Sequence, residues 1–224
     1  MNPQQHHSLQ QGLAQLPLIA ILRGITPDEI EPVADALIDA GFRFIEVPLN
    51  SPNAWDSIAR LRTHCPEPIL IGAGTVLSTE QVSQLAQLGG SLLITPNTNP
   101  EVIRAGVDAG LAPFIGCMTP SEAFAAAQAG ACALKLFPAA RLGPDYFKDL
   151  KAVLPAGLPV LAVGGVNVDN MAEWHWAGIG GFGFGSNLYT PGRPATEVGR
   201  IAAELVAEWH RLQQRHSQQS GSHD

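Results

Sequence analysis

Residues 112–138 read APFIGCMTPSEAFAAAQAGACALKLFP. Two apolar segments, Ala112–Cys117 and Ala133–Phe137, flank a stretch whose first residues, 119–122, have the chemistry of a helix N-terminus. We expect that helix to end at Ala129-Gly130, because glycine readily adopts the left-handed backbone that terminates many helices. The stretch therefore predicts a strand, a helix and a second strand, which is the unit from which parallel sheets are built.

The same unit recurs along the chain at a spacing of roughly 25 residues. Eight strand–helix units predict an α/β protein of one domain, a (β/α)₈ TIM barrel. An open, doubly wound sheet is the alternative, but the loop after the first strand, 23–26, is not a dinucleotide-binding fingerprint. The expected strands are Leu18–Arg23, Phe44–Leu49, Ile69–Thr75, Ser91–Pro96, Ala112–Cys117, Ala133–Phe137, Val160–Gly164 and Gly181–Gly185.

The two ends of the chain differ in composition from the part between them. Residues 1–12 are mostly polar and predict a tail or a short helix. Residues 13–212 hold the predicted barrel. Residues 213–224 are mainly Gln, Ser, Gly and His and predict a disordered tail.

The composition excludes several classes of function. The formal net charge of −7 argues against general nucleic-acid binding, and no apolar run is long enough to cross a membrane. The sequence shows no signal peptide, and three unpatterned cysteines are typical of a reducing compartment, so we expect a cytoplasmic protein. No cluster of His, Cys, Asp and Glu predicts a metal site, and we expect no cofactor.

Two charged residues interrupt apolar strands. Lys135 lies within Ala133–Phe137 and Glu46 within Phe44–Leu49. Because side chains alternate along a strand, the bulky leucines beside Lys135 should face the helices, and both charged groups should point into the barrel. Burial lowers the pKa of a lysine and leaves an amine that can attack a carbonyl. The pair predicts Schiff-base chemistry with an acid/base partner, with a structural ion pair as the alternative.

Other polar residues fall at the predicted carboxyl ends of strands, where barrels hold their active sites. Arg23 could bind a carboxylate or a phosphate, unless it is an ordinary surface arginine. Thr75 could donate a hydrogen bond to a carboxylate, unless it only ends its strand. The glycine-rich loops 163–167 and 183–187 follow strands seven and eight, where many barrels bind phosphate, although tight turns without a ligand would look alike.

These residues resemble a known family, the class I 2-keto-3-deoxy-6-phosphogluconate/6-phosphogalactonate aldolases. The resemblance covers residues 16–209, and the motifs occur in the family's order. They are Ile21-Leu22-Arg23-Gly24, Ile45-Glu46-Val47-Pro48-Leu49-Asn50-Ser51, Gly72-Ala73-Gly74-Thr75-Val76, Leu134-Lys135-Leu136-Phe137-Pro138 and Val163-Gly164-Gly165-Val166.

The resemblance implies a homotrimeric barrel that acts on a small phosphorylated 2-keto-3-deoxy sugar acid without a metal. It assigns Lys135 as the Schiff-base lysine and Glu46 as the residue that moves protons through a bound water. Arg23 and Thr75 would hold the substrate carboxylate. The expected phosphate ligands are Gly164, Gly165, Gly185 and Ser186.

Two positions separate the branches of the family. The phosphogluconate enzymes typically carry an arginine where this chain has Asn50, and a threonine where it has Val163. Together with Arg23, these residues resemble the phosphogalactonate branch. The alternatives are the phosphogluconate and 4-hydroxy-2-oxoglutarate activity of the same family, a phosphate-binding barrel isomerase that forms no imine, and a barrel that only binds a metabolite.

Overall fold

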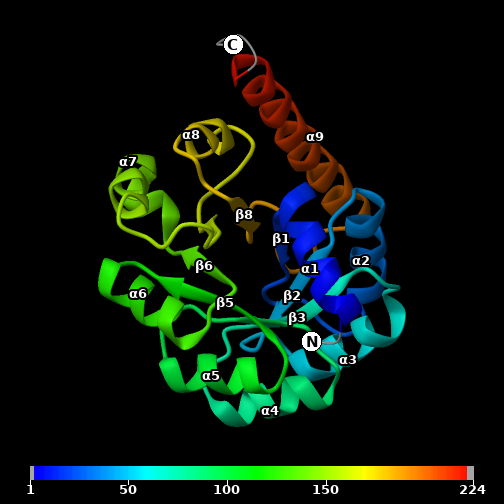
Figure 1. The fold of residues 1–224 in the computed structure, drawn as a ribbon. Coiled ribbons are helices and arrows are strands. Elements are labelled where there is room, and N and C mark those ends of the chain that lie inside the picture. Colours follow the sequence, from blue (N-terminus) through cyan, green and yellow to red (C-terminus); the bar gives the residue numbers. More distant parts are fainter. Residues whose placement is uncertain (1–2, 221–224) are drawn as a thin grey trace.

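The computed structural model describes residues 3–220, with the side chains of 216, 217, 219 and 220 excepted. Its strands are parallel and close into a barrel in chain order, so the predicted single-domain (β/α)₈ barrel is confirmed (Figure 1). The strands are β1 (Leu18–Ile21), β2 (Phe44–Pro48), β3 (Leu70–Gly74), β4 (Leu92–Ile94), β5 (Ala112–Cys117), β6 (Ala133–Leu136), β7 (Val160–Val163) and β8 (Gly181–Phe184).

Helices surround the barrel, as Figure 1 shows. They are α1 (Pro3–Gln15), α2 (Ile30–Asp39), α3 (Ala54–His64), α4 (Thr79–Gln87), α5 (Pro100–Asp108), α6 (Pro120–Ala129), α7 (Ala139–Lys151), α8 (Met171–Trp176) and α9 (Ala195–Ser220). None of the helices in the described part of the chain is both long and apolar enough to cross a membrane.

Local capping chemistry explains several helix ends. Ser78 and Asn99 accept hydrogen bonds from the first backbone N–H groups of α4 and α5, and Thr119 forms a capping box with Glu122 on α6. The sequence shows similar helix-start chemistry at Thr26-Pro27 and Ser51-Pro52 and predicts helix starts there, but both helices begin later. α2 begins at Ile30 and α3 at Ala54, because turns occupy the residues just before them.

Alternation along the strands separates two apolar layers. Side chains that face the helices, such as Ile45 and Leu134, belong to the outer core. Side chains that face inward, such as Phe44, Phe114 and Leu161, form a second cluster inside the barrel. This arrangement makes the barrel interior a packed core rather than a pore.

Helix α1 closes the end of the barrel at which the strands begin. Leu9 is 4% exposed and belongs to the inner cluster. Gly12 lies so close to Phe44 that a Cβ atom there would be 2.5 Å from the Phe44 ring. Part of the segment for which a tail or short helix was expected is thus a helix that packs on the core, while residues 1–2 lie outside the described part.

Helix α9 is longer than the sequence predicted. It packs on α2 and continues to Ser220, through most of the segment 213–224 for which a disordered tail was expected. Gln and Arg have good helix propensity and extend a helix that is already nucleated, which explains the difference. Its last turns project from the barrel (Figure 1), and residues 221–224 lie outside the described part.

Candidate functional site

Strands β2 and β6 bring a carboxylate and an amine into the barrel. Lys135 pairs in register with Gly116 and Leu161, and Glu46 pairs with Ile21 and Gly72. Glu46 is 1% exposed and Lys135 is 7% exposed. Both lie on the inward face with the inner cluster, which confirms the prediction from strand alternation.

Glycines on β3 make room for the Glu46 carboxylate. A Cβ atom on Gly74 would lie 1.8 Å from Glu46 Oε2, and one on Gly72 would lie 2.0 Å from the carbonyl oxygen of Leu92. Neither position can carry a side chain without moving its neighbours. The small residues of the 72–75 motif therefore serve the placement of Glu46 as well as the packing of the strands.

Burial shifts the pKa of both groups. It raises the pKa of the Glu46 carboxyl to about 7, opposed by the positive charges of Lys135 and Arg23. It lowers the pKa of the Lys135 amine, which the Glu46 charge opposes and the Arg23 charge reinforces. Burial therefore moves the Lys135 amine toward its neutral form, beside a carboxyl group that gains and loses a proton near neutral pH.

A small void borders both of these groups. It has a volume of about 10 Å³, and both Glu46 and Lys135 line it. Glu46 Oε2 accepts no hydrogen bond from any described residue. This volume is close to the minimum that holds one water molecule, so the void has room for a single water beside the carboxylate and the amine.

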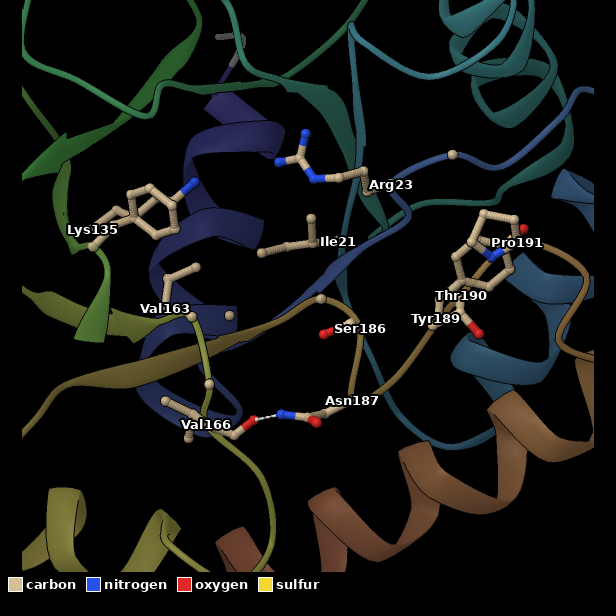
Figure 2. Close-up of a pocket in the computed structure, with 16 residues that line it drawn as sticks. Ile21, Arg23, Lys135, Val163, Val166, Ser186, Asn187, Tyr189, Thr190 and Pro191 are labelled. Carbon is tan, nitrogen blue, oxygen red and sulfur yellow. Dashed lines mark hydrogen bonds between the residues drawn. The ribbon is translucent and has the colours of Figure 1, made fainter. Parts of the chain in front are cut away.

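A larger cavity of about 450 Å³ opens above the void, at the carboxyl ends of the strands (Figure 2). Lys135 forms part of its floor, and its amine lies 5.1 Å from the centre of the Phe137 ring. The lining residues are Ile21, Arg23, Gly24, Lys135, Phe137, Val163, Gly164, Gly165, Val166, Gly183, Gly185, Ser186, Asn187, Tyr189, Thr190 and Pro191.

The glycine loops after β7 and β8 form one side of this cavity. Gly164 and Gly165 have φ angles of 97° and 75°, which favour glycine. Asn187 Nδ2 donates to the Val166 carbonyl oxygen at 2.7 Å and joins the two loops (Figure 2). The predicted residues of both loops thus lie together at the cavity.

Three predicted residues do not line the cavity: Glu46 borders only the void, and Asn50 and Thr75 border neither. Asn50 instead accepts a hydrogen bond from Arg23 Nη1 at 2.5 Å, so it orients an arginine that does line it. Thr75 follows β3 with a φ of 56°, a left-handed conformation that is costly for a β-branched residue. Such strain is often found at functional sites.

The loop after β8 supplies lining residues that the sequence reasoning missed. Tyr189, Thr190 and Pro191 lie on the opposite side of the cavity from Lys135 (Figure 2). The rule that barrel sites form at the carboxyl ends of strands could have found them, because they follow the predicted eighth strand closely.

No metal or redox centre is indicated in the described part of the chain. It contains no group of three or more His, Cys, Asp or Glu side chains placed to bind a metal ion. The three cysteines are free thiols, and burial raises the pKa of Cys65 to about 11 and of Cys117 to about 12. These thiols are poor nucleophiles and poor metal ligands.

Fold and site together define a (β/α)₈ barrel with a buried amine–carboxylate pair beneath a cavity between strand-end loops. Comparison with known proteins makes the class specific. The family described as "Aldolase: KDPG and KHG aldolase" matches residues 9–198. The chain therefore belongs to this family, and the resemblance stated from the sequence is confirmed.

Individual relatives divide by branch. The chain is 50% identical over 196 residues to the 2-dehydro-3-deoxy-6-phosphogalactonate aldolase of Escherichia coli K12, covering 88% of this chain and 96% of that one. It is 30% identical over 200 residues to the 2-dehydro-3-deoxy-phosphogluconate aldolase of Haemophilus influenzae, covering 87% and 93%. A solved structure titled "Native KDPGal structure" matches with a TM-score of 0.88 at 50% identity, covering 89% and 97%.

Proposed function

We propose that this chain is a Schiff-base aldolase that cleaves 2-dehydro-3-deoxy-6-phospho-D-galactonate to pyruvate and D-glyceraldehyde 3-phosphate. The observation that carries the proposal is the pair of buried groups, Lys135 and Glu46, which both line a void with room for one water beneath an open cavity. A neutral amine attacks carbonyls, and a carboxyl group whose pKa is about 7 exchanges protons at neutral pH.

The first half of the reaction forms the imine. The Lys135 amine attacks the C2 ketone and gives a carbinolamine. Glu46 starts protonated and donates through one water to the ketone oxygen, which becomes the carbinolamine hydroxyl. It then takes the proton released from the nitrogen and returns it to that hydroxyl, which leaves as water. The product is an iminium ion between Lys135 and C2, and its positive nitrogen is the electron acceptor of the next step.

The second half breaks the carbon chain. Glu46 takes the proton of the C4 hydroxyl, the C3–C4 bond breaks, and its electron pair moves into the iminium to form an enamine. Glyceraldehyde 3-phosphate leaves. Glu46 then donates the proton it took from the C4 hydroxyl to C3 of the enamine. Water hydrolyses the resulting iminium to release pyruvate and the free Lys135 amine, and Glu46 takes up the proton that this step releases. The iminium supplies the electron sink, so the cycle needs no metal.

The two ends of the substrate require different partners. We assign the carboxylate to Arg23 and Thr75, beside the nitrogen that forms the imine. We assign the phosphate to the backbone and hydroxyl groups of the loops after β7 and β8, with Gly164, Gly165, Gly185 and Ser186. Arg23, Gly164, Gly165, Gly185 and Ser186 all line the cavity, which supports this orientation.

The preference for the galacto epimer rests on Val163 and Asn50. Val163 lines both the cavity and the void, and its methyl groups offer no hydroxyl to the substrate at that point. Asn50 accepts a hydrogen bond from Arg23 and orients this arginine, which follows β1, to bind the substrate. The greater identity to the phosphogalactonate relative supports the same preference, and the phosphogluconate activity is the alternative.

Pyruvate release from the two phosphorylated epimers, measured side by side with chelator present, tests the proposal. We expect turnover of both to survive the chelator and kcat/KM to favour the galacto epimer. Equal kcat/KM values on the two epimers would still support an aldolase but would contradict the preference inferred from Val163 and Asn50. If neither epimer releases pyruvate, the aldolase proposal is contradicted, and an isomerase or a binding protein is favoured.

Assembly and location are part of the same proposal. We propose a cytoplasmic homotrimer, as the family resemblance implies. Large apolar side chains that are exposed in the single chain, among them Leu77, Met118 and Phe124, offer surface for subunit contact. Light scattering on the purified protein measures the subunit number, and a monomer or dimer would contradict the trimer.

A further inference from the structure

We propose that Glu29 is a positioning residue for substrate binding. It ties the loop after β8 to the loop after β1, and it thereby fixes the wall of the cavity formed by Tyr189, Thr190 and Pro191. The inference rests on the proposed function, because that wall lies on the opposite side of the cavity from Lys135, where the phosphorylated end of the substrate would lie (Figure 2).

The Glu29 carboxylate joins segments that are far apart in the sequence. Its Oε1 atom accepts from the Tyr189 hydroxyl at 3.3 Å and from the Gly192 backbone N–H at 3.1 Å. Its Oε2 atom accepts from the Thr26 backbone N–H at 3.1 Å and from the Thr26 hydroxyl at 2.6 Å. One oxygen therefore holds the loop after β8, and the other holds the loop after β1.

The wall sits directly against the loop that carries Arg23. Tyr189 is 1% exposed, and its ring is packed in the outer core. A Cβ atom on Gly24 would lie 2.7 Å from Pro191 Cγ, so the two loops are in close contact there. A shift of the loop after β8 would therefore move Thr190 and Pro191 relative to the cavity.

The other end of the same loop is fixed separately. Arg193 Nη1 donates to the carbonyl oxygens of Ser186, Asn187 and Leu188, at 3.4, 3.3 and 2.8 Å. These bonds hold the first turn of the loop from within. Glu29 adds the tie across to the loop after β1, which fixes the position of the cavity wall formed by Tyr189, Thr190 and Pro191.

A glutamine at position 29 would keep the size of the side chain but not its bonding. Both carboxylate oxygens face hydrogen-bond donors, and an amide has only one acceptor oxygen. Its NH₂ group would face either the Thr26 donors or the Tyr189 and Gly192 donors. Glu29→Gln therefore loosens one side of the tie while the neutral side chain still fills its place.

The test compares Glu29→Gln with Asp28→Asn in the full-length protein. Asp28 contacts Arg60, and its side chain is 92% exposed, so this control makes the same charge change one residue away. For Glu29→Gln we expect a roughly tenfold higher KM for the phosphorylated substrate and a kcat within about twofold of wild type. Borohydride trapping of the pyruvate imine should be unchanged, and Asp28→Asn should match wild type.

Tyr189→Phe provides a second variant, which removes one donor and keeps the buried ring. We expect a smaller rise in KM with the same kcat. An unchanged KM in both variants, or a parallel loss of kcat and imine trapping in Glu29→Gln, would overturn the inference. If wild type itself releases no pyruvate from either epimer, the proposed function fails, and this inference with it. If wild type is active and KM is unchanged in both variants, the inference about Glu29 fails, but the proposed function stands.

Discussion

Lys135 and Glu46 are individually unfavourable in the barrel interior and chemically useful as a pair. Burial disfavours the charged form of each group, so the amine tends to lose its proton and the carboxyl tends to keep one. An amine free to attack and a carboxyl group that exchanges protons at neutral pH are the two requirements of imine chemistry. The strand positions that make the pair costly for stability also make it reactive.

Replacing Lys135 by alanine should abolish turnover. Without the amine no imine forms, so the iminium that accepts the electrons of the C3–C4 bond does not exist. We expect pyruvate release to fall by at least about 10³-fold. Mass spectrometry after borohydride reduction with pyruvate should show the adduct on wild type and none on the variant.

Lys148→Ala is the matched control, because Lys148 is an exposed lysine on α7 that pairs with Asp145. It should keep both the activity and the adduct. Activity retained in Lys135→Ala, or an adduct that persists in that variant, would contradict the assignment of the Schiff-base lysine.

Glu46→Gln should lower activity and raise stability at alkaline pH. The pKa of Glu46 is about 7 in the folded protein and ordinarily 4.5, so folding favours the protonated carboxyl. The penalty for the buried carboxylate is therefore absent below about pH 4.5 and grows as pH rises through about 7. Glutamine carries no charge at any pH and avoids this penalty.

Urea unfolding near pH 5 and near pH 8 measures the effect. We expect Glu46→Gln to be more stable than wild type by about 1–3 kcal/mol near pH 8, with a smaller difference near pH 5. A difference that is the same at both pH values would mean that Glu46 does not titrate as the burial implies.

Val163→Thr tests the origin of epimer preference. The hydroxyl would replace one methyl group at a position that borders both the cavity and the void. A new hydrogen bond to one configuration at C4 and not to the other should change the ratio of kcat/KM by about tenfold toward the gluco epimer. The ratio is measured on both epimers with the same preparation, and Val163→Ala controls for the loss of the methyl group.

For individual residues, the sequence predicted the features that follow from side-chain alternation along strands and from position at strand ends. The inward direction of Lys135 and Glu46 followed from the apolar residues beside them. The contact of Asn50 with Arg23, and the wall at Tyr189, depend on how separate loops meet in space. Such contacts leave no periodic pattern in a single sequence.

Among the elements, β3 is specialised for the site. Gly74→Ala should reduce both activity and stability, since its Cβ atom would lie 1.8 Å from Glu46 Oε2 and displace the carboxylate. We expect an activity loss of about 10²-fold and a destabilisation of about 1–3 kcal/mol. Steady-state kinetics and urea unfolding measure the two effects.

Gly199→Ala in α9 is the control for adding one methyl group. Its Cβ atom would lie 3.3 Å from the Ala36 Cβ atom, a contact that a small shift relieves, and alanine favours a helix. We expect wild-type activity and a stability change below about 1 kcal/mol. Equal effects of the two substitutions would mean that the position of Glu46 does not depend on Gly74.

Helix starts were predictable where one side chain caps the helix. Ser78, Asn99 and Thr119 bond to backbone N–H groups within three residues, which a sequence pattern captures. The start of α2 was predicted one turn early, because Thr26 and Glu29 bond to each other before the helix and Glu29 also binds a distant loop.

For the whole molecule, the repeated strand–helix unit was sufficient to predict a barrel. Eight parallel strands that close on themselves leave no unpaired strand at an edge. The extent of α9 was not predictable from hydrophobic periodicity, because the residues after Leu212 are polar. Leu205, Trp209 and Leu212 are each at most 3% exposed, and Trp209 Nε1 donates to the Gln15 carbonyl oxygen at 3.1 Å. The core therefore ends at Leu212, whereas the helix continues.

Two truncated chains test whether the stable fold ends with the core at Leu212 or includes the exposed turns of α9. A chain that ends at Leu212 keeps all three anchors, so we expect wild-type activity and a melting temperature within a few degrees of wild type, about 2–4 °C. A chain that ends at Glu204 loses three large buried side chains, each of which stabilises the fold by about 2–4 kcal/mol. That sum is comparable to the whole stability of a typical domain, so the shorter chain should not fold. Circular dichroism melts and pyruvate release measure both, and loss of folding in the chain that ends at Leu212 would show that the exposed turns of α9 belong to the stable unit.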